Sequence, residues 1–232
     1  MIPRKILGVY GGMGPAASAE FLRLLAAMAP AKRDQEHPVV YVYSNAQTPD
    51  RTAAFFGRGE SPAAALRQGL DTLCGWGADL LAVPCNTAHI FIDPFRAQLR
   101  SPLIHIVEAT VADAVRAAPD GCWILATGAT MDSGIYEKEA ARRGYRFFAP
   151  SEEVRELATQ AIVRVKAGEL KAGGAVMEEI AARLWAVRRA PIVTACTELP
   201  LAYDASSLPP EMGISSLRSL SRACLEALYA EE

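Results

Sequence analysis

Residues 77–89 read Gly-Ala-Asp-Leu-Leu-Ala-Val-Pro-Cys-Asn-Thr-Ala-His, and this stretch decides the fold. Its apolar run, Leu80–Val83, predicts a short strand that is buried on both faces, as strands of parallel sheets are. The run ends at Pro84, and a thiol, Cys85, follows with small polar residues. Because ligands of open α/β sheets bind just beyond the carboxyl ends of the strands, we expect Cys85 in a functional site.

A second stretch, residues 191–198, repeats this pattern as Pro-Ile-Val-Thr-Ala-Cys-Thr-Glu. It again predicts an apolar strand that ends at a cysteine, here Cys196, with Thr197 beside it. Two thiols at the ends of two equivalent strands are placed to flank a single substrate. The sequence therefore indicates a site built around a pair of cysteines.

The whole chain shows the same internal correspondence. Cys85 lies 74 positions after the turn residue Gly11, and Cys196 lies 69 positions after its counterpart Thr127. Each half runs from a strand through a small-residue turn and helices to a cysteine strand. We predict an α/β fold of two pseudo-symmetric lobes, each a parallel sheet flanked by helices, with the active site in the cleft between them.

The expected lobes are residues 1–102 with 210–232, and residues 103–209. The boundary between them is placed at Ser101-Pro102, after which the strand and helix pattern starts again with a strand at residues 103–107. A last amphipathic helix, residues 215–229, is expected to pack back on the first lobe.

The first strand, residues 5–10, leads into Gly11-Gly12-Met13-Gly14-Pro15 and then a helix. Glycines permit a tight turn, and the N–H groups at a helix start favour an anion. The turn lacks the lysine of a phosphate loop, and the next strand, residues 39–43, ends without the acidic residue of a dinucleotide site. A carboxylate is the better candidate anion.

Composition narrows the class of protein further. The chain has 232 residues, 51% of them hydrophobic, and a formal net charge of −2, which argues against nucleic acid or an anionic membrane as the main partner. No apolar run approaches the ~20 residues of a spanning helix, and the first residues do not form a signal peptide, so a cytoplasmic protein is expected.

The cysteines fit a reducing compartment. They are odd in number, widely spaced and without a C-x-x-C motif, so neither a disulfide framework nor a metal site is expected. Three are interpreted as small buried hydrophobes, two on helices and one at the start of a strand. The five are Cys74, Cys85, Cys122, Cys196 and Cys224.

Paired thiols suit proton transfer at carbon. One thiolate removes a proton while an opposing thiol delivers one to the other face, which requires sulfur atoms about 6–8 Å apart across the carbon. Asn86, Thr87 and Thr197, with the N–H groups of their turns, are candidates to bind a carboxylate and stabilise the carbanion. Pyridoxal phosphate would need a lysine and a phosphate cradle; Lys166 has no such cradle, so no cofactor is expected.

Across nearly its whole length the chain resembles the cofactor-independent aspartate/glutamate racemase family, and its aspartate racemase branch in particular. Six motifs carry the resemblance: residues 8–15, Pro49-Asp50-Arg51-Thr52, Pro84-Cys85-Asn86-Thr87-Ala88-His89, Ser133-Gly134-Ile135-Tyr136, Lys166-Ala167-Gly168 and Cys196-Thr197-Glu198-Leu199-Pro200.

This resemblance implies a two-base racemase of aspartate or glutamate in which Cys85 and Cys196 are the acid/base pair. Asn86 and Thr87 match positions that bind the α-carboxylate, and Arg51 and Lys166 match cations that hold the side-chain carboxylate. A homodimer is implied as well. The substrate-binding residues expected on this basis are Met13, Pro49, Asp50, Arg51, Asn86, Thr87, Thr130, Lys166 and Thr197.

Other interpretations stay open. Related enzymes isomerise maleate, racemise hydantoins or decarboxylate malonates, and a non-catalytic module could bind an amino acid without reactive thiols. Arg51 read alone is a solvated loop cation. His89 is either a candidate general base or a helix-start residue that supports the site from behind, and Glu198 either bonds within the second lobe or orients Cys196.

Overall fold

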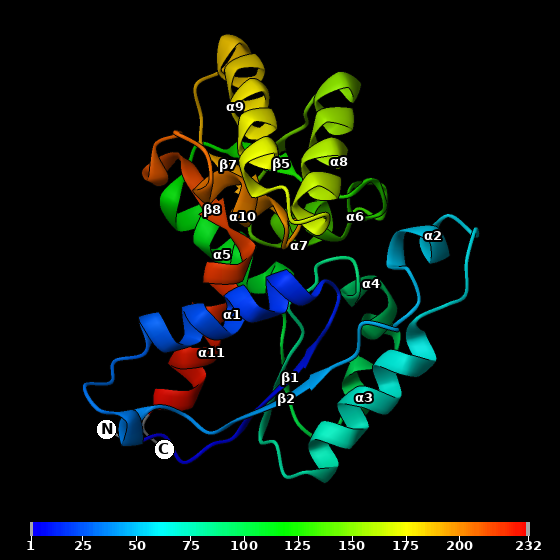
Figure 1. The fold of residues 1–232 in the computed structure, drawn as a ribbon, viewed down its shortest axis with the longest axis vertical. Coiled ribbons are helices and arrows are strands. Elements are labelled where there is room, and N and C mark those ends of the chain that lie inside the picture. Colours follow the sequence, from blue (N-terminus) through cyan, green and yellow to red (C-terminus); the bar gives the residue numbers. More distant parts are fainter. Residues whose placement is uncertain (1, 231–232) are drawn as a thin grey trace. The chain divides into compact units, whose positions relative to one another are not determined.

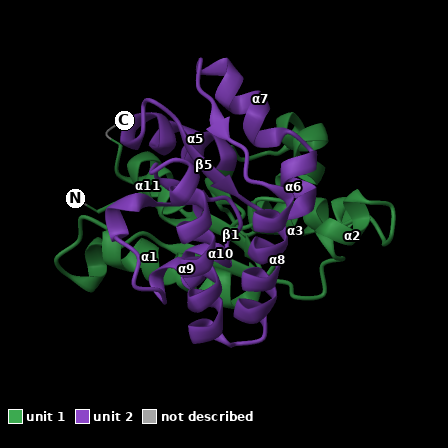
Figure 2. Cartoon of the chain, turned by 90° about the horizontal axis from the view of Figure 1, so that it is seen from above, with its two compact units in different colours: residues 1–106, 217–232 green, residues 107–216 purple. Residues whose placement is uncertain are grey.

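The computed structural model describes residues 2–230 and contains two four-stranded parallel sheets flanked by helices. The chain divides into two compact units, residues 1–106 with 217–232 and residues 107–216 (Figure 2). The predicted α/β class with two parallel sheets is confirmed. No helix within residues 2–230 is long and apolar enough to cross a membrane.

The first sheet has the strand order β2-β1-β3-β4. Helices α1 and α11 lie on one side of it and α3 on the other (Figure 1). Its strands are β1 (Leu7–Gly11), β2 (Val40–Ser44), β3 (Leu80–Ala82) and β4 (Leu103–Ile104), and its helices are α1 (Pro15–Met28), α2 (Arg51–Phe55), α3 (Ala63–Gly75), α4 (His89–Ile92) and α11 (Ser216–Tyr229), with 3-10 turns η1 (Asp34–Glu36) and η2 (Asp93–Gln98).

The second sheet repeats the first in its order, β6-β5-β7-β8. Helices α8 and α9 pack side by side in this unit (Figure 1). Its strands are β5 (Cys122–Leu125), β6 (Phe147–Phe148), β7 (Ile192–Thr194) and β8 (Gly213–Ser215), and its helices are α5 (Ile106–Ala117), α6 (Gly128–Asp132), α7 (Ile135–Arg142), α8 (Glu152–Lys166), α9 (Leu170–Val187) and α10 (Leu199–Asp204), with one 3-10 turn, η3 (Pro210–Met212).

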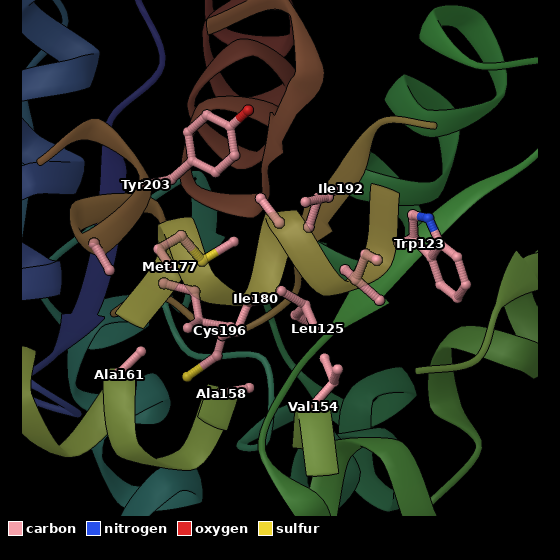
Figure 3. Close-up of a cluster of buried hydrophobic side chains, with 14 of the residues drawn as sticks. Trp123, Leu125, Val154, Ala158, Ala161, Met177, Ile180, Ile192, Cys196 and Tyr203 are labelled. Carbon is pink, nitrogen blue, oxygen red and sulfur yellow. The ribbon is translucent and has the colours of Figure 1, made fainter. Parts of the chain in front are cut away.

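The apolar patterns of the sequence account for both cores. In the first unit the side chains of alternate strand residues, Tyr10 and Leu81 among them, pack against the leucine face of α3. In the second, β5 and β7 pack against α8, α9 and α10 in a buried cluster that includes Ile180 and Cys196 (Figure 3). The predicted amphipathic helix at the end of the chain is α11, and its apolar face, Leu217, Leu220, Cys224 and Leu228, is buried.

Some local expectations were wrong. The expected strand at residues 103–107 is only two residues long, because α5 already begins at Ile106. The strand that does form there, β4, pairs with β3. It therefore belongs to the first sheet and does not begin the second lobe, as was expected. Residues 213–215 form β8, which pairs with β7 in the second sheet, whereas they were expected in the first lobe.

Two helices also differ from expectation. The polar turn after residue 50 is the helix α2, because the Asp50 carboxylate accepts a hydrogen bond from the Ala53 N–H at 2.6 Å and caps it. The small-residue turn expected at Thr127 continues as a further short helix, α6, because the Thr127 hydroxyl accepts a hydrogen bond from the Thr130 N–H and caps it. It is separate from α7, which begins after Gly134, whose φ of 66° lies in the left-handed region.

Candidate active site

Cys85 lies in the turn between β3 and α4, three residues beyond the last strand residue, and only 6% of it is exposed. Its N–H donates to the Val83 carbonyl at 2.8 Å. Its own carbonyl oxygen lies 2.9 Å from Nδ1 of His89. Because a carbonyl only accepts, Nδ1 carries the proton and His89 is the donor. Both main-chain polar groups of Cys85 are therefore bound inside the first unit.

His89 is the first residue of α4 and is fully buried. Burial, and next to it the charge of His105, lowers the pKa of His89 well below its ordinary value; the bond to the Cys85 carbonyl opposes this only in part. The two imidazole rings lie 4.3 Å apart, edge to face. His89 is therefore neutral at neutral pH, which makes it a poor proton carrier and a steady hydrogen-bond donor.

Asn86 and Thr87 follow Cys85 and are 2% and 5% exposed. The turn is closed by the N–H of His89, which donates to the Asn86 carbonyl at 3.1 Å. The structure thus brings both residues into the same short turn as Cys85. Their expected contact with a substrate carboxylate stays a prediction.

The glycine turn after β1 is tightly built. Gly12 has a φ of +95°, and a Cβ there would lie 2.5 Å from the Asn45 carbonyl carbon, so only glycine fits. Its N–H donates to the Ser18 hydroxyl of α1 at 2.8 Å. This donor is therefore occupied within the protein, and an anion at the turn would have to use other groups. Met13, the expected substrate neighbour, is 3% exposed.

The loop before Arg51 is held by a chain of hydroxyl groups. The Thr48 hydroxyl donates to the Asn45 carbonyl at 2.8 Å, so the Tyr10 hydroxyl, 2.8 Å from Thr48 Oγ1, is the donor to that oxygen. Tyr10 packs directly on Gly69 of α3, where an added Cβ would lie 1.8 Å from its ring. Core packing in the first unit thereby fixes the position of the loop.

Arg51, the first residue of α2, turns back onto this loop. Its Nη1 donates to the carbonyls of Thr48 and Pro49, both at 3.0 Å. Its Nε is buried and has no hydrogen-bond partner within the described residues. A buried N–H without an acceptor costs about 1–3 kcal/mol. The expected donation by Arg51 to a substrate carboxylate stays a prediction. Asp50 is exposed, and its carboxylate caps α2.

Cys196 lies two residues beyond β7 and is 6% exposed. Its thiol donates to the Glu198 carboxylate, with 3.1 Å between Sγ and Oε2, and the Thr197 hydroxyl lies 3.5 Å from the same oxygen. Glu198 is itself 4% exposed. In Figure 3 the Cys196 side chain is drawn together with Ala158 and Ala161 of α8, members of the same buried cluster.

The environment of Cys196 favours its thiol form. Burial raises the pKa of Cys196 well above its ordinary value, and the charge and hydrogen bond of Glu198 raise it further. The positive charge of Lys166 acts in the opposite direction. Lys166 is exposed at the last position of α8, so the structure brings two of the sequence-predicted residues within electrostatic reach of each other.

Thr130 lies in α6, the short helix that follows β5, and is 1% exposed. The Thr127 hydroxyl accepts from its N–H at 3.2 Å and caps α6. The hydroxyls of Thr127 and Thr130 are 3.0 Å apart. The small-residue turn predicted here is thus a helix cap, and the role of Thr130 toward a substrate stays a prediction.

The remaining cysteines differ from this pair. Cys122 and Cys224 are fully buried, as predicted, and burial raises the pKa of Cys122 to about 11. The Tyr145 hydroxyl lies 3.2 Å from the Cys122 sulfur. Cys74 is only partly buried on α3.

The family model described as Asp/Glu/Hydantoin racemase matches residues 11–223. The chain belongs to this family. The membership predicted from the six motifs is thereby confirmed.

Individual relatives agree with this membership. The chain is 30% identical to the broad specificity amino-acid racemase RacX of Bacillus subtilis (strain 168) over 137 residues, 57% of this chain and 59% of that protein. Its fold is similar to Picrophilus torridus aspartate racemase, with a TM-score of 0.83, 28% identity and coverage of 97% and 94% of the two chains. Glutamate racemase from Campylobacter jejuni subsp. jejuni, at 19% identity, shares the fold, with a TM-score of 0.66 and coverage of 97% and 87%.

Sequence reasoning missed several residues around the cysteines. His105 and Asp93 lie behind His89, with 3.0 Å between His105 Nε2 and Asp93 Oδ1, and no local motif marks them. Tyr136 is 1% exposed and interacts electrostatically with Cys196. Its motif, Ser133-Gly134-Ile135-Tyr136, was part of the resemblance, but the pattern assigned no role to the tyrosine.

Proposed function

We propose that this protein is an amino-acid racemase that acts on an acidic amino acid, aspartate or glutamate, with Cys85 and Cys196 as its acid/base pair. One observation carries the proposal: each sheet presents a buried cysteine in the turn that follows the equivalent strand, β3 or β7. Membership of the racemase family and similarity to an aspartate racemase along 97% of the chain support it.

In this mechanism one cysteine, as thiolate, takes the α-proton of the substrate. The electron pair of the C–H bond then passes into a carbanion that is delocalised onto the α-carboxylate. The other cysteine, as thiol, gives its proton to the opposite face of the same carbon, so that the configuration inverts and the two sulfur atoms exchange protonation states. Asn86, Thr87 and Thr197 supply the polar groups for the carboxylate and the developing enediolate.

The contacts of Cys196 suggest its part in this cycle. Because burial and Glu198 raise its pKa, Cys196 rests as a thiol and begins as the proton donor. After it has given up its proton, the thiolate lies beside the Glu198 carboxylate, and the repulsion between the two charges favours return of a proton to sulfur. Glu198 therefore orients the thiol and sets its proton affinity.

Arg51 supports the choice of an acidic substrate. Its buried Nε lacks an acceptor within the described residues, and a second carboxylate, on the substrate side chain, would supply one. Lys166 adds an exposed cation, in keeping with the expected role beside the substrate. A hydantoin whose substituent has no carboxylate would leave this donor without a partner.

Racemisation of purified, dialysed protein with each enantiomer of aspartate and glutamate tests the proposal. Chiral chromatography should show either enantiomer converging on an equal mixture, without added pyridoxal phosphate and unaffected by a chelator. Conversion of maleate, loss of carbon dioxide from a malonate, or tight binding without turnover would contradict racemisation and indicate one of the alternative functions. The expected homodimer and cytoplasmic location stay predictions, the first of which light scattering on a sizing column would test.

A further inference from the structure

Three side chains of the first unit form a series of contacts that ends at Cys85, and they have no part in the proposed proton transfers. They are His89, which opens α4, Asp93, which opens η2, and His105, which follows β4. The two histidines are 0% and 5% exposed, and the Asp93 side chain is 44% exposed. The contacts among them form a continuous chain from a partly exposed carboxylate to the main chain of Cys85.

The first contact fixes the Cys85 main chain. His89 Nδ1 donates to the Cys85 carbonyl at 2.9 Å, while the Cys85 N–H donates to Val83 at 2.8 Å. With both peptide groups next to its Cα bound, the cysteine has little freedom to rotate about φ and ψ. The hydrogen bond from the imidazole thereby helps to fix the direction of the Cα–Cβ bond of Cys85. That direction limits the positions that its sulfur atom can reach.

The second set of contacts holds the imidazole. The His105 ring packs edge to face on His89 with 4.3 Å between ring centres. His105 Nε2 lies 3.0 Å from Asp93 Oδ1, and because an ionised carboxylate only accepts, that nitrogen is the donor. Asp93 therefore orients His105, and His105 in turn forms one wall of the space that His89 occupies.

The remaining nitrogen of His89 shows that this is not ordinary core packing. Nε2 is buried and has no hydrogen-bond partner within residues 2–230. A leucine would fill the same apolar space without leaving a polar atom unpaired, which costs about 1–3 kcal/mol. The polar ring is thus explained by its other nitrogen, the donor to Cys85.

We propose that His89 is a positioning residue for Cys85, present as the neutral tautomer protonated on Nδ1 and held in place by His105 and Asp93. Its effect on the reaction rate rests on the proposed function. Its tautomer and its effect on the Cys85 thiol do not, so the two can fail separately.

The tautomer is measured on the unaltered protein. Protein with ¹⁵N-labelled histidine, studied by long-range ¹H–¹⁵N correlation at neutral pH, should show one imidazole with the proton on Nδ1, assigned by its absence in His89→Asn. A His89 ring protonated on Nε2, or on both nitrogens, would overturn the proposal.

Variants test the effect on the thiol. Asn places an amide donor near the position of Nδ1, whereas Leu fills the space without a donor. We expect His89→Leu to change the iodoacetamide alkylation rate of Cys85 by about tenfold, leave that of Cys196 within about twofold, and slow racemisation by about 10–100-fold, the range of a misplaced acid/base group. In His89→Asn both rates should return most of the way to wild type, and His37→Leu, at the residue that follows η1, should match wild type.

Each outcome decides the proposal. Wild-type alkylation and racemisation in a folded His89→Leu would overturn it, as would equal defects in His89→Asn and His89→Leu. If His89→Leu does not fold, the comparison of His89→Asn with wild type carries the test, and a tenfold change of Cys85 alkylation in that variant would also contradict a donor role. A protein that racemises no amino acid, yet shows the Nδ1 tautomer and the selective change at Cys85, would refute the proposed function and leave the positioning role intact.

Discussion

The turn after β3 and the turn after β7 occupy the same place in two sheets of the same strand order, yet they hold their cysteines by different contacts. Cys85 is bound through its main chain, by a neutral histidine four residues later. Cys196 is bound through its sulfur, by a carboxylate two residues later. The first contact fixes where a thiol lies, whereas the second also changes how strongly it holds its proton.

This difference shows what a duplicated fold allows. Two equivalent strand ends supply two thiols in equivalent places. The residues just beyond each strand then determine the position and the proton affinity of that thiol independently of the other. The proposed mechanism needs one thiol and one thiolate at the start of each turnover, and unequal surroundings favour one such arrangement over the other. A substitution just beyond one strand should therefore change the reactivity of the thiol at that strand and leave the reactivity of the other thiol unchanged.

The largest effect short of the cysteines themselves is expected at Arg51. Arg51→Ala should lower kcat/KM for aspartate and glutamate by about 10–150-fold, the equivalent of a charge-assisted hydrogen bond of about 1.5–3 kcal/mol. Arg51→Lys should also be impaired, because an ammonium cannot replace a planar guanidinium. Both enantiomers should lose equally, since the equilibrium constant is one. Arg58→Ala, an exposed arginine over Phe56 in the same region, is the control, and an unchanged kcat/KM in Arg51→Ala would contradict the assignment.

Glu198→Gln tests the second turn. Removing the charge should lower the pKa of Cys196, since Glu198 raises it after burial does. Alkylation of Cys196 should then rise at lower pH than in wild type while that of Cys85 keeps its profile, and racemisation should fall by about tenfold, at the low end of acid/base effects. Glu179→Gln, in an exposed ion pair with Arg183, serves as control. If the pH profile of alkylation shifted at Cys85 and not at Cys196, the assigned role of Glu198 would be contradicted.

Lys166→Ala should act on the same thiol with the opposite sign and less strength. Its ammonium lowers the pKa of Cys196, so its loss should move the alkylation profile of Cys196 to higher pH. Because Lys166 is exposed, solvent screens its charge, and we expect a change of no more than about fivefold in rate. Lys171→Ala, in α9, is the matched control. Movement of the profile to lower pH would show that Lys166 does not face this thiol.

The smallest effect is on folding stability, and it comes from His89, beyond β3. His89 stays neutral in the folded protein because burial and His105, with a lesser contribution from Arg96, lower its pKa. The unfolded chain takes up this proton below pH ~6.5, so the free energy of unfolding should fall by about 0.7 kcal/mol between pH 7 and pH 6 from this group. Urea titrations at the two pH values measure it. In His89→Asn the free energy of unfolding should fall less between these two pH values, because the histidine is absent. An equal pH dependence in both proteins would refute the prediction.

The sequence sufficed for the elements that long apolar patterns specify. The strands before Cys85 and Cys196, the proline at the start of α1 and the leucine face of α3 all follow from local spacing. It did not reveal β8, whose three residues become a strand only by pairing with β7. Nor did it reveal α6, whose five residues were expected as a turn and become a helix once Thr127 caps them.

The sequence indicated which residues belong to the candidate site, but it did not indicate most of the contacts between them. Both cysteines and Arg51 stand out by their motifs, but their partners depend on side-chain direction. His89 lies four positions after Cys85, a spacing that places it beside the Cys85 carbonyl only once α4 has formed. His105 and Asp93 meet through the pairing of β4 with β3, which no periodicity indicates.

Exchange of the α-proton in D₂O by Cys85→Ala and Cys196→Ala tests the central claim, that two thiols act on opposite faces of one carbon, most directly. Wild-type product should carry deuterium at Cα. Each alanine variant should lose racemisation by a factor of about 10²–10⁴ or more, since one face can no longer be protonated. Any exchange that remains should proceed with retention, for one enantiomer in Cys85→Ala and for the other in Cys196→Ala. Racemisation near the wild-type rate by either variant would contradict the account.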